Sequence, residues 1–285
     1  MKFSTLALVS CLTALATALP VKRALVPGKH FDRVMIIIFE NQDYDTAHGD
    51  PYYGTLAEKH NGVVLSNYMS LTHPSQPNYI GLISGSLEGV FSDLQVNINR
   101  NSIVDLLEAK GISWKAYQEA YAGGCDKKMR IGTYARKHNP FMSIVNIQEN
   151  PDRCAKIVNS EQLDKDIAND EVPQFVFFTP DMNNDSHDTD MAYASKWFEG
   201  FLEPRIGKTE LNKNTMFVAT FDENATYTIK NQIMTVLFGP DFKRSSTQAE
   251  DNTPYNHYSL LRTIEDNWDL GDLGKKDAEA TPIQL

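Results

Sequence analysis

Residues 34–41 read Val-Met-Ile-Ile-Ile-Phe-Glu-Asn, six apolar residues followed directly by a carboxylate and an amide. An apolar run of this length, rich in isoleucine, is typical of a strand buried on both faces of a sheet. Four more stretches are predicted to be buried strands: 113–117, 174–179, 215–221 and 233–238. Apolar residues with helical spacing occur between and after them, at 102–110, 192–202 and 258–268. Strands that alternate with helices predict an α/β fold with a largely parallel sheet.

Three of these strands run into polar, ionisable residues. The residues concerned are Glu40-Asn41 after the first strand, Asp181 and then His187 after 174–179, and Asp222-Glu223 after 215–221. Ligands of open α/β sheets bind outside the carboxyl ends of the strands, so we expect a shared site at that edge. For any one strand the alternative is that such residues only form the turn that ends it.

Four of these side chains are candidate metal ligands. Carboxylate and amide oxygens suit Mg²⁺, Ca²⁺ or Mn²⁺, and carboxylates also bind Zn²⁺. The sequence therefore predicts a divalent metal ion whose identity stays open, held by Glu40, Asn41, Asp222 and Glu223.

The segment 73–79, His-Pro-Ser-Gln-Pro-Asn-Tyr, precedes a predicted helix at 79–84 that Gly85 closes. Ser75 is therefore expected near the start of a helix, where peptide N–H groups and the helix dipole favour an anion such as phosphate. A serine hydroxyl beside a metal ion is a potential nucleophile for phosphorus. The alternative is that Ser75 only caps the helix.

Together these motifs resemble those of the phosphoesterase family in the alkaline phosphatase superfamily, which contains secreted fungal acid phosphatases and bacterial phospholipases C. The resemblance covers residues 34 to about 268, in the family's order. Its segments are Glu40-Asn41, Ser75-Gln76-Pro77-Asn78, 137–141 (Lys-His-Asn-Pro-Phe), 184–188 (Asn-Asp-Ser-His-Asp), 220–223 (Thr-Phe-Asp-Glu) and 257–262 (His-Tyr-Ser-Leu-Leu-Arg). One departure is Ser186, where the family's histidine motif usually has glycine.

The resemblance implies a three-layer α/β sandwich of the alkaline phosphatase type and a phosphoserine intermediate on Ser75. It also implies that Asn78 donates to a phosphoryl oxygen and that three histidines line the phosphate pocket: His138, His187 and His257. Because few carboxylates match the superfamily's second metal position, we expect one metal ion, with histidines in place of the other. One of the last two histidines is expected to protonate the leaving alcohol, and Lys137 is a possible phosphate contact.

The resemblance also implies the reaction, hydrolysis of small-molecule phosphate monoesters by an acid phosphatase. Two alternatives remain at this stage. The first is a phospholipase C or other phosphodiesterase on the same scaffold, and the second is a non-catalytic extracellular binding protein.

Composition excludes some classes of partner. The 285 residues include 27 Lys+Arg and 37 Asp+Glu, a formal charge of −10, with 41% apolar residues. This acidic balance argues against a nucleic-acid binder, which needs a basic face, and against docking on anionic membranes. No stretch has the roughly 20 apolar residues of a transmembrane helix.

The N-terminus predicts export. A basic start, a short apolar run and an Ala-x-Ala pattern indicate a signal peptide at 1–19, although a buried helix is the alternative. Lys22-Arg23 looks like a dibasic processing site of fungal secretory pathways, which makes 20–23 a propeptide and 24–285 a single phosphoesterase domain. We therefore expect a secreted protein, either free in the medium or associated with the cell wall.

The cysteines fit that compartment. Cys11 would leave with the signal peptide, so Cys125 and Cys154 are expected to form a disulfide, with two free thiols as the alternative. These two cysteines lie in a stretch, 121–160, that is expected to be an insertion or lid. The glycosylation sequons at Asn184 and Asn224 lie in the predicted active site, so we expect them to carry no glycan.

Overall fold

The computed structural model describes residues 25–244 and 248–285, so the predicted signal peptide and dibasic propeptide lie outside the described residues. An eight-stranded sheet crosses the molecule. In spatial order its strands are β11 (Glu250–Asp251), β2 (Val63–Leu65), β10 (Thr235–Phe238), β9 (Thr215–Phe221), β1 (Arg33–Phe39), β8 (Phe175–Thr179), β4 (Trp114–Gln118) and β7 (Ile157–Asn159). All neighbours pair in parallel except β10, which is antiparallel to both β9 and β2. The predicted α/β fold with a largely parallel sheet is confirmed.

The centre of the sheet consists of the three most apolar predicted strands. Every residue of β1, β8 and β9 is buried. The register pairs Phe39 with Phe221 and Ile37 with Phe178, so the carboxyl ends of these strands lie side by side. Burial of both faces accounts for their continuous apolar sequences, because no side of such a strand faces water.

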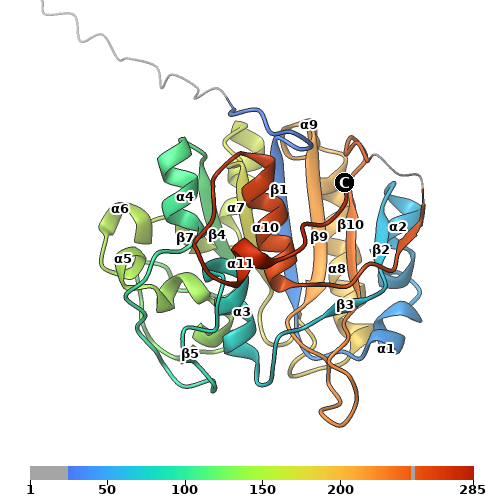
Figure 1. The fold of residues 1–285 in the computed structure, drawn as a ribbon, viewed down its shortest axis with the longest axis horizontal. Helices are drawn as coiled ribbons and strands as arrows, with labels where there is room; N and C mark the ends of the chain where they lie inside the picture. Colours follow the sequence, from blue (N-terminus) through green and yellow to red (C-terminus); the bar gives the residue numbers. More distant parts are fainter. Residues whose placement is uncertain (1–24, 245–247) are drawn as a thin grey trace, which may run out of the picture.

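Helices cover both faces of the sheet (Figure 1). The longer ones are α3 (Ser75–Ser84), α4 (Ile103–Lys110), α7 (Gln162–Asn169), α8 (Met191–Ile206) and α10 (His257–Asn267). In Figure 1, α3 and α10 lie in front of the sheet and α8 lies behind it. Aromatic pairs attach α8 to the sheet: the ring centroids of Phe39 and Phe198 are 5.0 Å apart, and those of Phe178 and Phe201 are 4.4 Å apart.

Shorter elements fill the edges. The helical turns are α1 (Tyr44–His48), η1 (Tyr53–Thr55), α2 (Leu56–Lys59), η2 (Arg136–His138), η3 (Pro140–Ser143), α5 (Val145–Gln148), α6 (Pro151–Cys154), α9 (Thr209–Asn212) and α11 (Lys276–Glu279). Two small sheets join β3 (Tyr68–Met69) to β12 (Tyr255–Asn256) and β5 (Arg130–Ile131) to β6 (Tyr134–Ala135). Among the described residues, no helix is both long and apolar enough to cross a bilayer.

Helix α3 begins four residues earlier than predicted, at Ser75. Pro77 does not prevent this, because it lies in the first turn, where a peptide N–H has no partner within the helix. The helix ends at Gly85 as predicted, with a left-handed φ of 72°. The early start makes Ser75 the first residue of α3. This end of the helix lies beside the carboxyl ends of the central strands.

The stretch 121–160 was predicted to be an insertion or lid, but its last residues belong to the main sheet. Residues Ile157–Asn159 form β7, which pairs with β4 at the edge of the main sheet. Three residues with one fully buried side chain give no apolar run, which is why the sequence did not indicate a strand. The predicted disulfide is present between Cys125 and Cys154, whose Cα atoms are 5.7 Å apart. A loop of this length stabilises the fold by about 3–4 kcal/mol.

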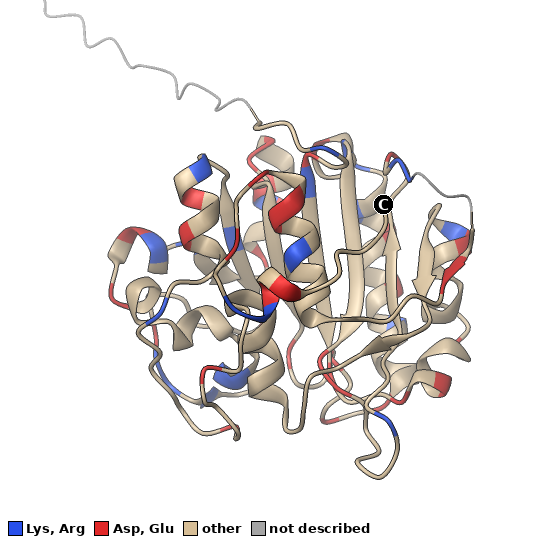
Figure 2. Cartoon of the chain, in the orientation of Figure 1, with Lys and Arg blue, Asp and Glu red and all other residues tan. Residues whose placement is uncertain are grey.

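Most charged side chains lie on helices and loops, and few lie in the main sheet (Figure 2). Glu265 of α10 is a buried carboxyl that faces Asp277 of α11. The neighbouring Arg262 is 3.8 Å from its Oε2, also contacts Asp266 and Asp272, and does not neutralise it. Burial and the charge of Asp277 raise the pKa of Glu265 to about 9.

This pKa predicts that acid stabilises the fold. Since the unfolded value is near 4.5, the contribution is complete below that pH and is lost as the pH rises toward about 9. The Tm of the wild type should therefore fall between pH 5 and pH 8, and Glu265→Gln should flatten this slope and be the more stable protein at pH 8. Glu279→Gln, an exposed change on α11, is the control. Parallel Tm profiles for wild type and Glu265→Gln would contradict the prediction.

Candidate active site

The hydroxyl of Ser75 meets carboxylates from two neighbouring strands. Its Oγ donates to Glu40 Oε1 and to Glu223 Oε1, the latter at 3.1 Å. Glu40 follows β1 directly and Glu223 follows β9 by one residue. Because β1 and β9 are parallel and end in register, the predicted strand-end residues and the predicted nucleophile lie together at the carboxyl edge of the sheet.

The acidic groups here are crowded and buried. Asp222 Oδ1 accepts from the peptide N–H of Glu223 at 2.7 Å, and Asp222 Oδ2 has no hydrogen-bond partner. The same is true of the buried Asn41 Oδ1. Burial and the charge of Glu40 raise the pKa of Asp222 well above its ordinary value and that of Glu223 to about 8. Buried oxygen donors without partners, together with repelling carboxyls, fit a divalent cation.

Lys137 brings a positive charge to the same place. Its Nζ lies 3.1 Å from Glu40 Oε1, 3.4 Å from Asp93 Oδ2 and 3.2 Å from His187 Nε2. Burial lowers the pKa of Lys137, but the charges of Glu40 and Asp93 outweigh it and the net shift is upward. The side chain is therefore an ammonium ion beside the nucleophile.

His138 connects two buried carboxylates. Its Nε2 is 2.8 Å from Glu40 Oε2, its Nδ1 is 3.1 Å from Asp185 Oδ2, and its ring stacks on Tyr79 at 5.0 Å. Burial opposes its charge, but both carboxylates outweigh burial and raise its pKa to about 9. Burial also opposes the charge of Glu40 and by itself would raise its pKa. The positive charges of His138 and Lys137 outweigh burial and lower the pKa of Glu40 to about 2.

Glu40, His138 and Asp185 also form a possible metal-binding group, since their ligand atoms all lie within 4.8 Å of one another. A protonated His138, however, donates from both ring nitrogens and has no lone pair for a metal. In this state Glu40, His138 and Asp185 form an ion-pair network. Both ligand sets contain buried atoms without a hydrogen-bond partner: Glu40 Oε2, His138 Nε2 and Asp185 Oδ2 in this one, and Asn41 Oδ1 and Asp222 Oδ2 in the other.

His187 lies at the mouth of the site. Its Nδ1 is 2.7 Å from Asp188 Oδ1, its Nε2 is next to Lys137, and 29% of its side chain is exposed. Asp188 thus orients the ring and leaves Nε2 on the side of Lys137.

Two predicted site residues use their polar atoms on the backbone. Asn78 Oδ1 accepts from Ser70 Oγ and from the peptide N–H groups of Leu71 and Thr72, and its Nδ2 donates to Thr72 O. Asn78 therefore fixes the turn that precedes Ser75 rather than projecting a free amide.

His257 is likewise engaged with the backbone. Its Nε2 lies 2.8 Å from the carbonyl oxygen of Asp222, and its Nδ1 lies 3.3 Å from the Tyr68 hydroxyl. Burial lowers its pKa to about 4, so the ring is neutral. This geometry supports the end of β9 and leaves neither ring nitrogen directed at the mouth.

Two further residues were not predicted. His73 contacts Glu223 Oε2 through Nδ1 and stacks on Tyr227, with ring centroids 3.8 Å apart. Asp93 accepts the peptide N–H of Gln76 at 3.0 Å. The signal for His73 was its place next to the Ser75 motif. Asp93 lies in a loop without a pattern, so sequence alone gave no signal for it.

The start of α3 offers fewer free donors to an anion than expected. The N–H of Gln76 is bonded to Asp93, and Pro77 has none. The helix dipole remains, and Lys137 becomes the main positive group of the protein at the site. Both sequon amides are also engaged: Asn184 Nδ2 donates to Glu119 and the buried Asn224 Nδ2 to the backbone, at 2.9 and 3.0 Å.

The sequence matches the Phosphoesterase family over residues 50–271. The chain belongs to this family. A probable acid phosphatase of Kluyveromyces lactis is 40% identical over 91% of this chain and 63% of the relative. An acid phosphatase of Aspergillus fumigatus is 34% identical over 91% of this chain and 60% of the relative. The chain thus spans less than two thirds of the length of these two fungal relatives.

A phosphatidylinositol-3-phosphatase of Mycobacterium tuberculosis is 26% identical over 86% of this chain and 79% of the relative. Among solved structures, a protein of the alkaline phosphatase superfamily from Vibrio parahaemolyticus matches with a TM-score of 0.56 at 14% identity, over 89% of this chain and 71% of that one. This likeness shows the fold and confirms the predicted architecture, and the family match confirms the predicted family resemblance.

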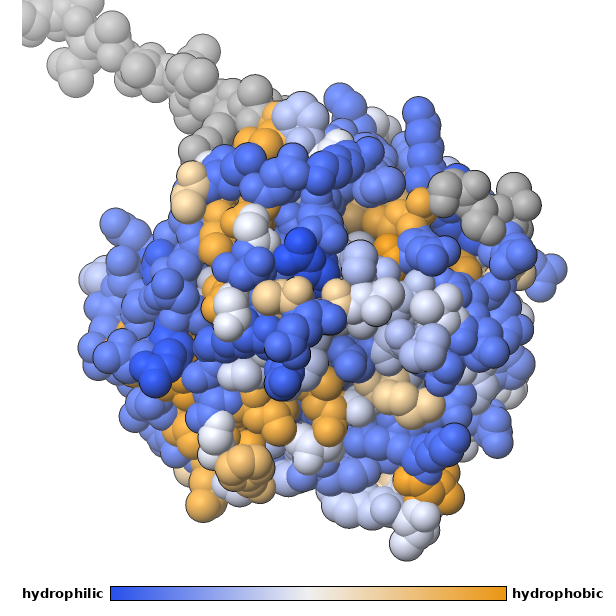
Figure 3. Space-filling view, viewed as in Figure 1, coloured by the Kyte–Doolittle hydropathy of each residue, from blue (hydrophilic) through white to orange (hydrophobic). Residues whose placement is uncertain are grey.

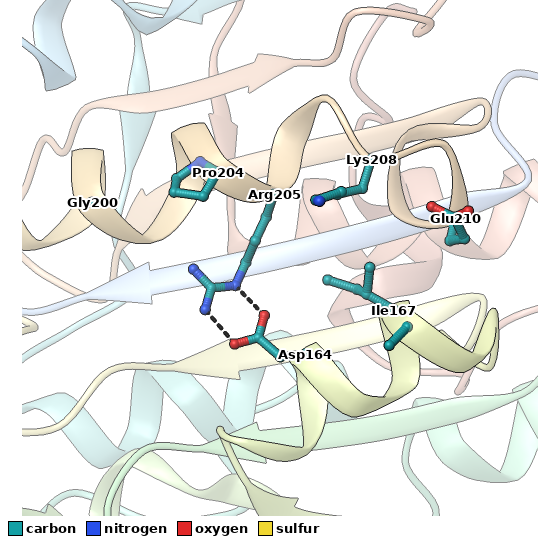
Figure 4. A pocket seen from close by; sticks show the side chains of 8 residues that line it. Asp164, Ile167, Gly200, Pro204, Arg205, Lys208 and Glu210 are labelled. Carbon is teal, nitrogen blue, oxygen red and sulfur yellow. Dashed lines mark hydrogen bonds and ion pairs between the residues drawn. The ribbon is translucent and has the colours of Figure 1, made fainter.

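A cavity of about 600 Å³ lies away from this site, between α7 and the end of α8 (Figure 4). Helix α8 starts close to the site and runs away from it, so Arg205 in its last turn lies at the opposite edge of the sheet. Arg205 forms two hydrogen bonds to Asp164, at 2.8 and 2.7 Å. The Arg205 and Asp164 charges in this cavity therefore satisfy each other.

Proposed function

We propose that this chain is a secreted phosphomonoesterase of the acid phosphatase type, which releases inorganic phosphate from small organic monoesters through phosphorylated Ser75. The contact of Ser75 Oγ with Glu40 and Glu223, beside the Lys137 ammonium, is the observation that carries the proposal. The names of the two fungal relatives, a probable acid phosphatase and an acid phosphatase, support it.

The first half of the reaction forms the phosphoserine. Ser75 Oγ attacks phosphorus and passes its proton to Glu40, the ionised carboxylate that accepts its hydroxyl, while the bond between phosphorus and the ester oxygen breaks. In the structure Lys137 Nζ donates to His187 Nε2; when Lys137 turns to the phosphoryl oxygens, Nε2 is free to hold the proton that it gives to the leaving alcohol. The charge of Lys137 stabilises the phosphoryl oxygens in the transition state.

The second half reverses these proton transfers. His187, now neutral, takes a proton from water, and the water oxygen attacks the phosphoserine. Ser75 recovers its proton from Glu40 as phosphate leaves. His187 suits this role better than His257, because it is partly exposed and oriented by Asp188, whereas His257 is fully buried against the Asp222 carbonyl.

A divalent cation would be held by Glu40, Asn41, Asp222 and Glu223, and when bound it would supply positive charge at the phosphoryl oxygens and favour the ionised form of Ser75. Three buried residues then have a positioning role. Asn78 fixes the nucleophile turn, His257 fixes the end of β9, and His138 fixes the Glu40 carboxylate.

Replacing the nucleophile should remove the activity. Ser75→Ala is expected to lower kcat for 4-nitrophenyl phosphate at least about 1,000-fold while the Tm stays close to that of the wild type. Ser66→Ala, whose hydroxyl makes one long contact with Asp251 O, is the matched control. Turnover near the wild-type level in Ser75→Ala would remove Ser75 from the reaction. Faster hydrolysis of bis(4-nitrophenyl) phosphate than of the monoester by the wild type would favour a phosphodiesterase.

The proposed ligand set predicts which substitution weakens metal binding. Asp222→Asn is expected to lower divalent-metal affinity at least about tenfold, because it removes a charged ligand, whereas Asp185→Asn should change it little. Calorimetric titration of metal-stripped protein measures both, with the exposed Asp241→Asn as control. The reverse ranking would assign the metal to Glu40, His138 and Asp185 instead.

The role of His187 predicts a dependence on the leaving group. His187→Asn should lower kcat/KM for glycerol 2-phosphate about 100-fold or more, and much less for 4-nitrophenyl phosphate, whose alcohol leaves readily as an anion. His48→Asn, on the exposed helix α1, is the control. An equal loss on both substrates would show that His187 does not donate the proton.

A further inference from the structure

A cavity of about 170 Å³ opens beside Lys137. We propose that it is the subsite for the alcohol part of the ester and that it selects aromatic leaving groups. This inference rests on the proposed phosphatase function and adds to it a class of substrate. The cavity is lined by three apolar residues, Met129, Ala135 and Met182, and by five polar or charged ones, Asp93, Gln95, Arg130, Arg136 and Lys137.

Two walls of the cavity are attached to the nucleophile turn. Asp93 accepts the peptide N–H of Gln76, which directly follows Ser75. Lys137 lies 3.1 Å from Glu40 Oε1, and Glu40 holds the Ser75 hydroxyl. A phosphoryl group on Ser75 beside Lys137 is thus next to the cavity, and the ester substituent is the part of the substrate that remains to fill it.

The size and lining of the cavity suit one aromatic ring. A dry apolar cavity of about 150 Å³ is large enough for benzene. Met182 is 1% exposed and Ala135 8% exposed, whereas Met129, which also lines the cavity, is half exposed. Thioether sulfur atoms make favourable contacts with aromatic rings.

Most charged groups that line the cavity are already engaged. Arg130 is 2.7 Å from Asp188, Arg136 Nη2 donates to the carbonyl oxygens of Val96 and Met142, and Asp93 is bonded to Gln76. The buried Nε and Nη1 of Arg136 have no partner. A leaving group rich in hydroxyls would lose water here and find few free partners, which costs free energy. The lining therefore favours an apolar substituent over a polyol.

The approach to the cavity is apolar as well. Seven large apolar side chains are exposed among the described residues, and five of them belong to three segments near the site: Phe91 (73%), Leu94 (68%), Met129 (49%), Tyr227 (60%) and Ile229 (55%). Gln76 Nε2 donates to the carbonyl oxygens of Ser92 and Leu94, which keeps the first segment beside the nucleophile. Figure 3 shows apolar side chains along the lower edge of this view, where the central strands end.

Phosphonates test the subsite without any chemical step. We expect the wild type to bind phenylphosphonate about tenfold more tightly than methylphosphonate, because only the phenyl group buries apolar surface. Met129→Ser should reduce this ratio about threefold, and Ala135→Leu, which fills the cavity, should bring it close to one. Tyr193→Ser, half exposed on α8, is the control and should keep the wild-type ratio. Equal affinities of the wild type for the two phosphonates would overturn the proposal.

Hydrolysis distinguishes this proposal from the function on which it rests. The ratio of kcat/KM for phenyl phosphate to that for glycerol 2-phosphate should fall in Met129→Ser by the same factor as the phosphonate ratio. If both esters are hydrolysed and neither variant changes either ratio, the subsite is wrong and the phosphatase function stands. If neither ester is hydrolysed, the proposed function fails, and the phosphonate ratios still decide whether the cavity binds an aromatic ring. Should Ala135→Leu not fold, Met129→Ser, at a half-exposed position, still tests the subsite.

Discussion

The mutual repulsion of three buried carboxyl groups is the constraint on which the site depends. Glu40, Asp222 and Glu223 lie together because β1 and β9 are parallel neighbours that end in register. Burial removes the water that would otherwise screen their charges. Every positive or hydrogen-bonding group around them reduces that repulsion, so the same arrangement that is costly for an unliganded protein favours the binding of a cation.

The surrounding residues divide into those that hold the backbone and those that reach the mouth. Asn78 and His257 bond to the backbone and fix the nucleophile turn and the end of β9. His138 forms an ion pair with the Glu40 carboxylate. Lys137 and His187 lie where a phosphate ester would enter, and both are partly exposed. The proposed reaction thus depends on few side chains, each held by others that lie away from the mouth of the site.

The sequence predicted the central strands and the convergence of their ends, because buried parallel strands have long apolar runs and share one edge. It did not predict β7 or the start of α3 at Ser75, since short edge strands lack such runs and the prolines of 74–77 suggested a turn. Sequence also does not say where a side chain points. Asn78 and His257 were expected to face phosphate, and the structure bonds both to the backbone. Asp93 reaches the site through a loop whose path no local pattern indicates.

The antiparallel pairing of β10 has a consequence for how this scaffold can diversify. Parallel neighbouring strands need a long crossover connection. The antiparallel strands β9 and β10 are instead joined directly by a loop at the site, and the described residues of this loop contain no helix. That loop carries Tyr227 and Ile229 at the rim. Insertions there would leave the sheet register and Ser75 in place, so evolution can exchange the rim while the reaction centre is inherited unchanged.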